Sequence, residues 1–348
     1  MHPRLAPVIR RLTGGGNLSA SEAEAAFDVV MSGEASPVEI TALLVGLRTK
    51  GHAPSEVAGG VRALRRAMIP VAAPADAVLV DTCGTGGGSV TTFNISTAAA
   101  IVAAAGGVPV AKHGNRSFSS KCGSADVLEA LGVEIELSAR AMARVLERAG
   151  IVFMFAPLLH PAMRHVGPVR AELGLPTIMN LLGPLTNPAG ARRQVVGVSK
   201  PGLLPLIAGA LRELGHERAL VVHGAPGMDE ISPLGPTRVA ELDRGEVREY
   251  DVDPGGLGFE AADPGEIRGG TPDENARVIA EVFAGRERGG ARSAVAVNAG
   301  GALYLGGRAE DLARATRLAQ ELIDSGAAGR TLDRLREESA AARSRQER

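Results

Sequence analysis

The chain has 348 residues, of which 45% are hydrophobic and 22% are charged. That length exceeds one ordinary domain and the apolar content excludes disorder over most of the chain, so we expect two lobes with sizeable cores. A net charge of -1, an aromatic content of 3% and only two cysteines argue against a nucleic-acid-binding surface and exclude a disulfide framework.

The N-terminal segment carries no targeting signal. Arg4, Arg10 and Arg11 interrupt it and leave no apolar stretch of the kind that a secretory signal needs. Residues 82–111 contain no charged side chain, but their glycines and threonines make a poor membrane span. They indicate a buried loop followed by a buried helix. We therefore expect a cytoplasmic protein that has no contact with a membrane.

Residues 1 to about 70 have the pattern of short helices joined by turns. Ser36 and Glu39 form a capping box with Pro37 at the first helical position, and Ser19 with Glu22 has the same spacing. A third helix is expected from Pro54, and residues 70–74 have the composition of a linker. We therefore predict a helical domain over residues 1–72.

From residue 76 the pattern changes to alternating strands and helices, which is typical of an α/β domain. We expect this domain to cover residues 76–348. Strands are predicted at residues 78–81, 108–111, 151–155, 195–198 and 219–222. Helices between them are predicted at residues 125–131, 139–149 and 202–214.

Two segments depart from this alternation. Residues 160–190 contain five prolines and show weak periodicity. We interpret them as a crossing that returns to the helical domain and completes it. The tail after Thr331 is charged and rich in alanine, so we predict a solvated helix that frays.

A glycine-rich loop follows the first predicted strand. Residues 81–89 lie between that strand and a helix, so backbone N–H groups can converge there on an anion near the positive helix end. The loop lacks the third glycine of a dinucleotide site and the Gly-Lys of a Walker loop. Anion binding and a plain tight turn both remain open on composition alone. Asn94 and Ser96 can cap the next helix or serve a phosphate or a metal held there.

Several ordered blocks over about 310 residues resemble the anthranilate phosphoribosyltransferase family. The blocks are Gly84-Thr85-Gly86-Gly87, Asn94-Ile95-Ser96-Thr97, Lys112-His113-Gly114-Asn115, Gly123-Ser124-Ala125-Asp126, His160-Pro161-Ala162-Met163, Pro168-Val169-Arg170, Asn180-Leu181-Leu182-Gly183-Pro184-Leu185, His223-Gly224 and Asp229-Glu230-Ile231-Ser232.

The resemblance implies a nucleoside phosphorylase-like α/β fold: a small N-terminal helical domain and a larger α/β domain with a central, mainly parallel sheet. It implies transfer of phosphoribose from phosphoribosyl pyrophosphate to the amine of anthranilate, giving N-(5-phosphoribosyl)anthranilate and pyrophosphate in tryptophan biosynthesis. It further implies Mg²⁺ as cofactor, with two ions per subunit, and a homodimer formed through the helical domain.

The resemblance also assigns site residues. For phosphoribosyl pyrophosphate they are Gly84, Thr85, Gly87, Thr92, Asn94, Ser96, Thr97, Lys112, Ser119 and Ser124. For anthranilate they are Gly84, His113, Asn115, His160, Arg170, Gly183 and Pro184. For the metal they are Ser96, Asp229 and Glu230. Arg170 is expected to pair with the anthranilate carboxylate, and Arg170 and Asn115 are positioning groups in a reaction without a covalent nucleophile.

Two positions depart from the family pattern. Family members commonly carry Asp-Gly where this chain has Gly88-Ser89, and they often carry Ser where Cys122 stands. The loss of a carboxylate beside the pyrophosphate predicts an altered dependence on Mg²⁺.

Two other functions are compatible with parts of the pattern. A pyrimidine nucleoside phosphorylase shares the expected fold but is expected to carry its own Lys and Ser motifs for the nucleoside. A non-enzymatic relative that binds nucleic acid is expected to have a basic face and to have lost acceptor residues. The net charge and the presence of Arg170 favour the transferase.

Overall fold

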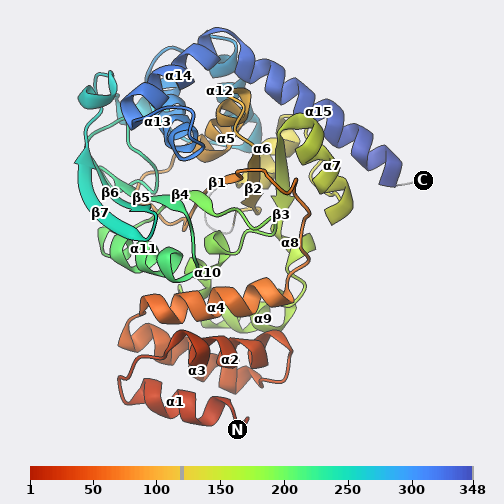
Figure 1. The fold of residues 1–348 in the computed structure, drawn as a ribbon, viewed down its shortest axis with the longest axis vertical. Helices are drawn as coiled ribbons and strands as arrows, with labels where there is room; N and C mark the ends of the chain where they lie inside the picture. The colour runs from red at the N-terminus through yellow and green to blue at the C-terminus, as the bar shows by residue number, and fades with distance from the viewer. Residues whose placement is uncertain (118–120, 347–348) are drawn as a thin grey trace.

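The computed structural model describes residues 1–117 and 121–346, which form two lobes placed one above the other in Figure 1. The lower lobe in that view is helical. Helices α9 and α10 come from the middle of the chain: α9 packs against α2 and α3, and α10 packs against α4. These helices are α1 (Leu5–Thr13), α2 (Ala20–Met31), α3 (Pro37–Lys50), α4 (Pro54–Ala67), α9 (Met163–Leu173) and α10 (Met179–Leu185).

Local capping explains where the first helices begin. The predicted capping boxes of Ser19 with Glu22 and Ser36 with Glu39 are both present, so each helix start satisfies two backbone N–H groups that have no partner inside the helix. The predicted start at Pro54 is confirmed as well. None of the described helices is long and apolar enough to cross a bilayer.

The upper lobe is built on one seven-stranded sheet (Figure 1). The strands are β1 (Val80–Gly84), β2 (Val110–Gly114), β3 (Ile151–Phe155), β4 (Arg193–Gly197), β5 (Arg218–Gly224), β6 (Thr237–Asp243) and β7 (Glu246–Val252). Their order is β3-β2-β1-β4-β5-β6-β7, and the first five are parallel while β6 and β7 are antiparallel to their neighbours. The expected mainly parallel sheet is confirmed.

Helices cover both faces of the sheet. α5 and α13 contact one face, and α11 lies on the other, toward the helical lobe (Figure 1). The helices of this lobe are α5 (Ile95–Ala105), α6 (Ser124–Ala130), α7 (Ala139–Ala149), α8 (Ala156–Leu159), α11 (Leu204–Glu213), α12 (Pro272–Phe283), α13 (Gly290–Leu305), α14 (Leu312–Asp324) and α15 (Ala327–Gln346), with short 3-10 turns at Pro201–Leu203, Gly255–Leu257 and Pro264–Ile267.

Some predicted boundaries were wrong. The strand at residues 151–155 and the helix at residues 139–149 are found as predicted. β1 and β2, however, begin about two residues later than predicted and continue into the glycine-containing segments. Strand pairing determines these boundaries. β1 pairs with β4 from Val80 as far as Gly84, which lies opposite Gly197, so the loop begins only at Thr85.

The prediction of a solvated C-terminal tail was also wrong. α15 packs along α5 and α7 and buries Leu332, Leu335, Ser339 and Ala342. These residues recur at intervals of three and four, which places them on one helical face despite the charged composition. The β6–β7 hairpin was not predicted. Its two-residue turn, Arg244-Gly245, has positive φ at both positions, as such tight turns require.

A buried carboxylate on β6 holds the antiparallel edge of the sheet. Glu241 is fully buried, and it accepts hydrogen bonds from the Tyr304 hydroxyl at 2.7 Å, the Tyr250 hydroxyl at 2.8 Å and the Arg248 guanidinium at 2.9 Å. It therefore links α13, β6 and β7.

We expect Glu241→Gln to destabilise the protein by about 2 kcal/mol, because an amide nitrogen would then face a donor inside the core. The midpoint of thermal unfolding falls by roughly 4–8 °C on this estimate. Glu249→Gln on β7, where the carboxylate is exposed, is the matched control and leaves the midpoint unchanged. Equal midpoints for the two variants would contradict this role of Glu241.

Candidate active site

The glycine-rich loop emerges from the carboxyl end of β1. The Thr85 N–H donates to the Gly197 carbonyl at 2.8 Å, and the Ser89 N–H donates to the Gly227 carbonyl at 2.9 Å. Between these anchors Gly86 and Gly87 are exposed and have φ of 67° and 81°, a conformation that favours glycine. The predicted loop is thus held open at the carboxyl edge of the parallel strands, where α/β proteins bind ligands.

The start of α5 lies beside this loop, but Asn94 does not cap it through its side chain. Its Oδ1 instead accepts from Asn275 Nδ2 at 2.9 Å, and its Nδ2 donates to the Cys122 carbonyl at 3.4 Å. Thr92 pairs with Arg268 in an isolated bridge, which ties the loop to a distant segment. Asn94 therefore joins the loop, the residues before α6 and α12.

Lys112 is buried in the middle of β2, with 3% of its surface exposed. Its ammonium donates to the Thr82 carbonyl at 2.6 Å and lies 3.3 Å from the Ser96 hydroxyl. No carboxylate among the described residues pairs with it within ion-pair distance. Burial lowers the pKa of Lys112, while the charges of Asp81 and Glu230 raise it. A buried cation of this kind suits a polyanionic ligand.

Thr97, which the resemblance assigns to the donor substrate, is buried near the start of α5. Its side chain is 1% exposed, and its hydroxyl has no hydrogen-bond partner among the described groups. It lies against a small cavity lined by core residues such as Ile101 and Leu128. Lys112 lines the same cavity, so Thr97 lies close to the buried lysine.

Two carboxylates stand on the segment after β5. Burial raises the pKa of Asp229, and burial together with the neighbouring Asp229 raises the pKa of Glu230 to about 8. The Ser96 N–H donates to Glu230, and the Gly86 N–H donates to Asp229. The predicted metal residues Ser96, Asp229 and Glu230 are therefore together at the glycine-rich loop.

This donor set fits Mg²⁺ only in company with other ligands. No group of three His, Cys, Asp or Glu side chains that could hold a metal occurs in residues 1–117 and 121–346. Two carboxylates and a hydroxyl are hard oxygen donors, which Mg²⁺ prefers, and it commonly completes its octahedron with water and substrate phosphates. The site therefore fits a metal that arrives with a phosphorylated substrate.

A second cluster of predicted residues includes His113, near the carboxyl end of β2, and His160, which follows α8. The Nε2 atoms of His113 and His160 are 3.1 Å apart. Burial lowers the pKa of His113 to about 3 and that of His160 to about 4, so both rings are neutral near pH 7. The Pro184 carbonyl accepts from the Cys83 thiol at 3.4 Å, which places the end of α10 against β1.

Arg170 projects from α9 without an acidic partner. Its guanidinium is half-buried, donates weakly to Asn180 Oδ1 at 3.5 Å and makes no ion pair in the described part of the chain. Burial lowers the pKa of Arg170. A guanidinium is always charged and presents its donors in a planar fork, so Arg170 is available for an anionic ligand.

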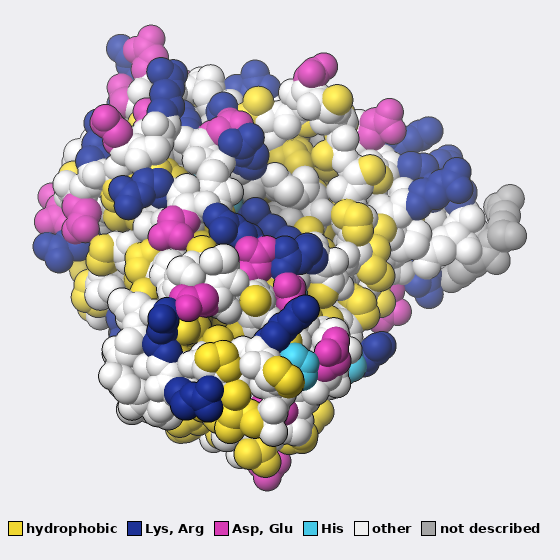
Figure 2. All heavy atoms as spheres, turned by 60° about the horizontal axis from the view of Figure 1, so that its bottom comes forward, with side chains coloured by type: hydrophobic (Ala, Val, Ile, Leu, Met, Phe, Trp, Pro, Cys, Tyr) yellow, Lys and Arg dark blue, Asp and Glu magenta, His cyan; other side chains and the backbone are white. Residues whose placement is uncertain are grey.

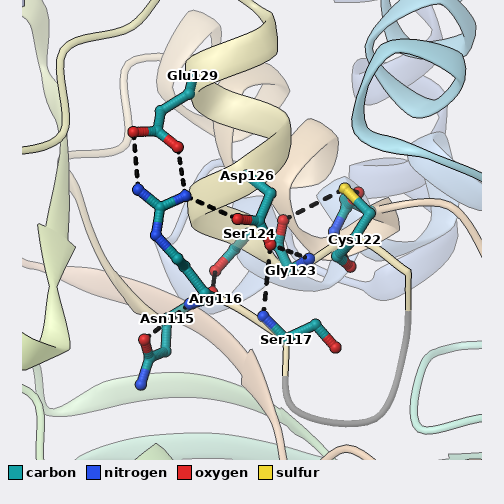
Figure 3. Close-up of polar contacts among 9 residues, drawn as sticks. Asn115, Arg116, Ser117, Cys122, Gly123, Ser124, Asp126 and Glu129 are labelled. Carbon is teal, nitrogen blue, oxygen red and sulfur yellow. Dashed lines mark hydrogen bonds and ion pairs between the residues drawn. The ribbon is translucent and has the colours of Figure 1, made fainter.

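The segment between β2 and α6 is organised by Arg116 (Figure 3). Its guanidinium donates to Glu129 at 2.9 Å and to Asp126 at 2.8 Å. Asp126 also accepts from the Gly123 N–H at 2.8 Å, so Gly123 and not Ser124 caps α6. The Ser124 hydroxyl instead donates to the Asn115 carbonyl at 3.2 Å. Asn115, the first residue after β2, is exposed. Ser119 lies outside the described residues.

The face shown in Figure 2 is hollowed near its centre, and Lys and Arg side chains gather beside the hollow. That view brings the helical lobe forward. Basic groups beside a hollow favour an anionic substrate, although the net charge of the whole chain is -1.

Comparison with known proteins identifies the family. Residues 6–68 match the family described as "Glycosyl transferase family, helical bundle domain" and residues 76–329 match its "a/b domain". Anthranilate phosphoribosyltransferase of Rubrobacter xylanophilus is 51% identical over 330 residues, which cover 95% of this chain and 96% of that protein. The Agrobacterium fabrum enzyme is 47% identical and covers 99% of both chains. The chain belongs to the anthranilate phosphoribosyltransferase family.

Solved structures of anthranilate phosphoribosyltransferases share the fold. The Thermus thermophilus enzyme superposes with a TM-score of 0.90 at 44% identity and covers 95% of this chain and 99% of its own. The Saccharomyces cerevisiae enzyme in complex with phosphoribosyl pyrophosphate and Mg has a TM-score of 0.88 at 26% identity, with coverage of 98% and 99%. The expected family and fold are confirmed.

Gly88, which departs from the pattern of anthranilate phosphoribosyltransferases, lies against Asp229. A Cβ at this position would be 2.9 Å from Asp229 Oδ1 and 3.0 Å from the Gly227 carbonyl. An aspartate here therefore moves Asp229 or the segment that carries it, and it adds a negative charge beside the metal residues.

We expect Gly88→Asp to shift the Mg²⁺ concentration that gives half-maximal activity severalfold. Gly88→Ala is the matched control, because it adds the same Cβ without the charge. Titration of Mg²⁺ against initial rate checks this, and superimposable curves for the two variants would reject a role for the charge.

Three polar residues near the site were not singled out from the sequence. Asn298 of α13 holds the backbone after Glu230, since its Oδ1 accepts from the Ile231 N–H and its Nδ2 donates to the Ile231 carbonyl, both at 2.9 Å. Asn275 holds Asn94, and Asn187 holds Asp81. The signal for Asn298 was present, because it is a lone amide within an apolar helix of Ala, Val and Gly.

Proposed function

We propose that this chain transfers the 5-phosphoribosyl group of phosphoribosyl pyrophosphate to the amine of anthranilate, with release of pyrophosphate, as a step of tryptophan biosynthesis. One observation carries the proposal: a glycine-rich loop, a buried lysine and two carboxylates share one edge of the sheet, and Arg170 on α9 makes no ion pair with a described residue. The loop, the lysine and the two carboxylates suit the donor substrate with its metal, and Arg170 suits the carboxylate of the acceptor.

The donor side holds the phosphates and ribose. The residues proposed for it are Gly84, Thr85, Gly87, Thr92, Asn94, Ser96, Thr97, Lys112, Ser119 and Ser124. Backbone N–H groups of the loop and the positive end of α5 provide dipoles, and Lys112 provides a charge. Asn94 and Thr92 act mainly by fixing the loop, as their contacts with Asn275 and Arg268 indicate.

We assign Mg²⁺ to Ser96, Asp229 and Glu230, with one ion on Ser96 and Glu230 and a second on Asp229 and Glu230. When bound, the metal neutralises charge on the departing pyrophosphate. The protein contributes the ionised carboxylates, held by the Gly86 and Ser96 N–H groups, and excludes bulk water from them.

The acceptor side comprises His113, Asn115, His160, Arg170, Gly183 and Pro184. Arg170 pairs with the anthranilate carboxylate, and the neutral histidine rings line the site without adding charge. An arylamine is neutral at physiological pH, so its lone pair is available and no strong base is required. The residues instead align the amine with the ribose C1′, and closure of the lobes protects the activated sugar from hydrolysis.

The organisation of the subunit follows the same proposal. We assign residues 1–72 to the helical domain, completed by helices within residues 160–190, and residues 76–348 to the α/β domain. The packing of α9 on α2 and α3 and of α10 on α4 supports this division. We further propose a cytoplasmic homodimer formed through the helical domain, which analytical ultracentrifugation tests.

Anthranilate fluorescence tests the function directly. We expect the signal to fall when protein, phosphoribosyl pyrophosphate and Mg²⁺ are all present, and to persist when any one is omitted. A persistent signal with folded protein would overturn the proposal and leave phosphate-dependent nucleoside cleavage or nucleic-acid binding to be assayed.

A further inference from the structure

A fully buried carboxylate, Asp81, contacts the candidate active site but is not among the residues assigned to the donor, the acceptor or the metal. Asp81 of β1 has no exposed surface. Its Oδ1 accepts from the His113 N–H at 3.3 Å, and its Oδ2 accepts from Asn187 Nδ2 at 2.8 Å and Gln194 Nε2 at 3.3 Å. The carboxylate is thus shared by β2, β4 and the segment that follows α10.

The partners of Gln194 fix the orientation of its amide. Its Nε2 also donates to the Pro184 carbonyl at 3.0 Å, and its Oε1 lies 2.9 Å from His216 Nε2. A carboxylate and a carbonyl only accept, so the group facing them must be the amide nitrogen. Burial lowers the pKa of His216 to about 3, so the ring is neutral and its Nε2–H donates to Gln194.

Asn187 is held equally firmly. Its Nδ2 donates to Asp81 and to the Ala111 carbonyl, both at 2.8 Å, and its Oδ1 accepts from the Ala189 N–H at 2.9 Å. Asp81, Asn187 and Gln194 are all without exposed surface. The side-chain polar atoms of these three residues all have partners within the network, which is the condition under which buried polar groups impose a single geometry.

The network connects the two halves of the candidate site. Asp81 pairs in register with Gln194, and the residue after Asp81 is Thr82, whose carbonyl receives the Lys112 ammonium. Gln194 also holds Pro184 at the end of α10, a helix that packs on α4 of the helical lobe. The strands that carry the donor side are therefore bonded to the helix that carries part of the acceptor side (Figure 1).

We propose that Asp81 and Gln194 are positioning residues that hold Pro184 and His113 in place for the acceptor, relative to the strands that hold Lys112 for the donor. This inference rests on the proposed function. Stability alone does not explain the network, because apolar side chains of the same volume commonly replace a buried polar group at little cost. Apolar side chains cannot, however, fix the position of a particular carbonyl or N–H.

Gln194→Met tests the inference, because methionine keeps the approximate volume and the unbranched shape but cannot bond to Pro184. We expect KM for anthranilate to rise by about tenfold or more, since small misplacements of bound groups have large effects. KM for phosphoribosyl pyrophosphate changes by less than about twofold, because the loop and Lys112 keep their own contacts. Asp81→Asn is the second variant. It loses the acceptor shared by Asn187 and Gln194, so KM for anthranilate is expected to rise as well. Because the charge of Asp81 also raises the pKa of Lys112, we expect KM for phosphoribosyl pyrophosphate to rise in this variant, but not in Gln194→Met.

Glu241→Gln provides the control for a buried polar change, because Glu241 is equally buried but lies on β6, outside the network. We expect it to lower the unfolding midpoint and to leave both KM values unchanged. If the wild type is inactive, the proposed function fails. If the wild type is active and both network variants keep the wild-type KM for anthranilate, the positioning role fails. It also fails if neither network variant folds while Glu241→Gln does, since the network then serves stability alone.

Discussion

Replacing Glu230 by Gln lowers the Mg²⁺-dependent rate by roughly 100- to 1000-fold, the range seen when a group that stabilises developing charge is removed. Glu230 is the residue that we assign to both metal ions, and the neighbouring Asp229 contributes to the raised pKa of Glu230. Glutamine keeps the shape but supplies no charge to offset that of the ion. Initial rates over a series of Mg²⁺ concentrations measure the loss.

The pH dependence of Mg²⁺ binding follows from the same pair. Burial and Asp229 raise the pKa of Glu230 to about 8, so the unliganded site holds a proton at pH 7. Mg²⁺ binds the ionised form, so occupation of the site displaces one proton from Glu230. The apparent affinity therefore increases with pH, by up to about tenfold per unit below pH 8, and levels off above it.

Two comparisons separate this role from a loss of folding. Glu246→Gln changes an exposed carboxylate at the start of β7 and keeps the wild-type rate and pH profile. At pH 7 Glu230→Gln folds with an unchanged unfolding midpoint, because the wild-type carboxyl is protonated there and glutamine is neutral as well. If Glu230→Gln retained the steep increase of Mg²⁺ affinity with pH, Glu230 would not be a metal ligand.

Local signals predicted the parts of this fold that depend on neighbours in sequence. The capping boxes at Ser19 and Ser36 and the strand at residues 151–155 were correct because a few adjacent residues determine each of them. The ends of β1 and β2 depend on pairing with other strands and were misplaced. The buried face of α15 shows in its spacing of three and four, but its charged composition concealed it.

The candidate site shows the same division. The glycine-rich loop and the carboxylate pair follow from local sequence, and the structure brings them together. The contacts of Asn94 and Gln194 do not follow from local sequence, because their partners are distant. Asn94 contacts Asn275, 181 residues away, and Gln194 contacts Asp81, 113 residues away. An amide at a helix start is most often a cap, so a capping role for Asn94 was a reasonable expectation until its long-range partner was known.

Arg170→Ala raises KM for anthranilate by roughly 10- to 100-fold, which corresponds to the loss of a charge-assisted hydrogen bond worth about 1.5–3 kcal/mol. The guanidinium has no acidic partner among the described residues, and its one hydrogen bond, to Asn180, is long at 3.5 Å. Its removal therefore costs the folded protein little. The anthranilate carboxylate, in contrast, loses its planar two-pronged partner. Steady-state rates at saturating phosphoribosyl pyrophosphate give the KM.

Arg170→Lys refines the result, since lysine restores the charge but not the paired donors, and we expect a KM between those of the wild type and the alanine variant. Arg164→Ala is the matched control, because Arg164 lies on the same helix and is exposed. If Arg170→Ala and Arg164→Ala gave the same KM for anthranilate, the carboxylate would have to bind elsewhere. Asn115 could not replace Arg170 in that role, because an amide offers no charge. The basic groups beside the hollow in Figure 2 would then be the next positions to change.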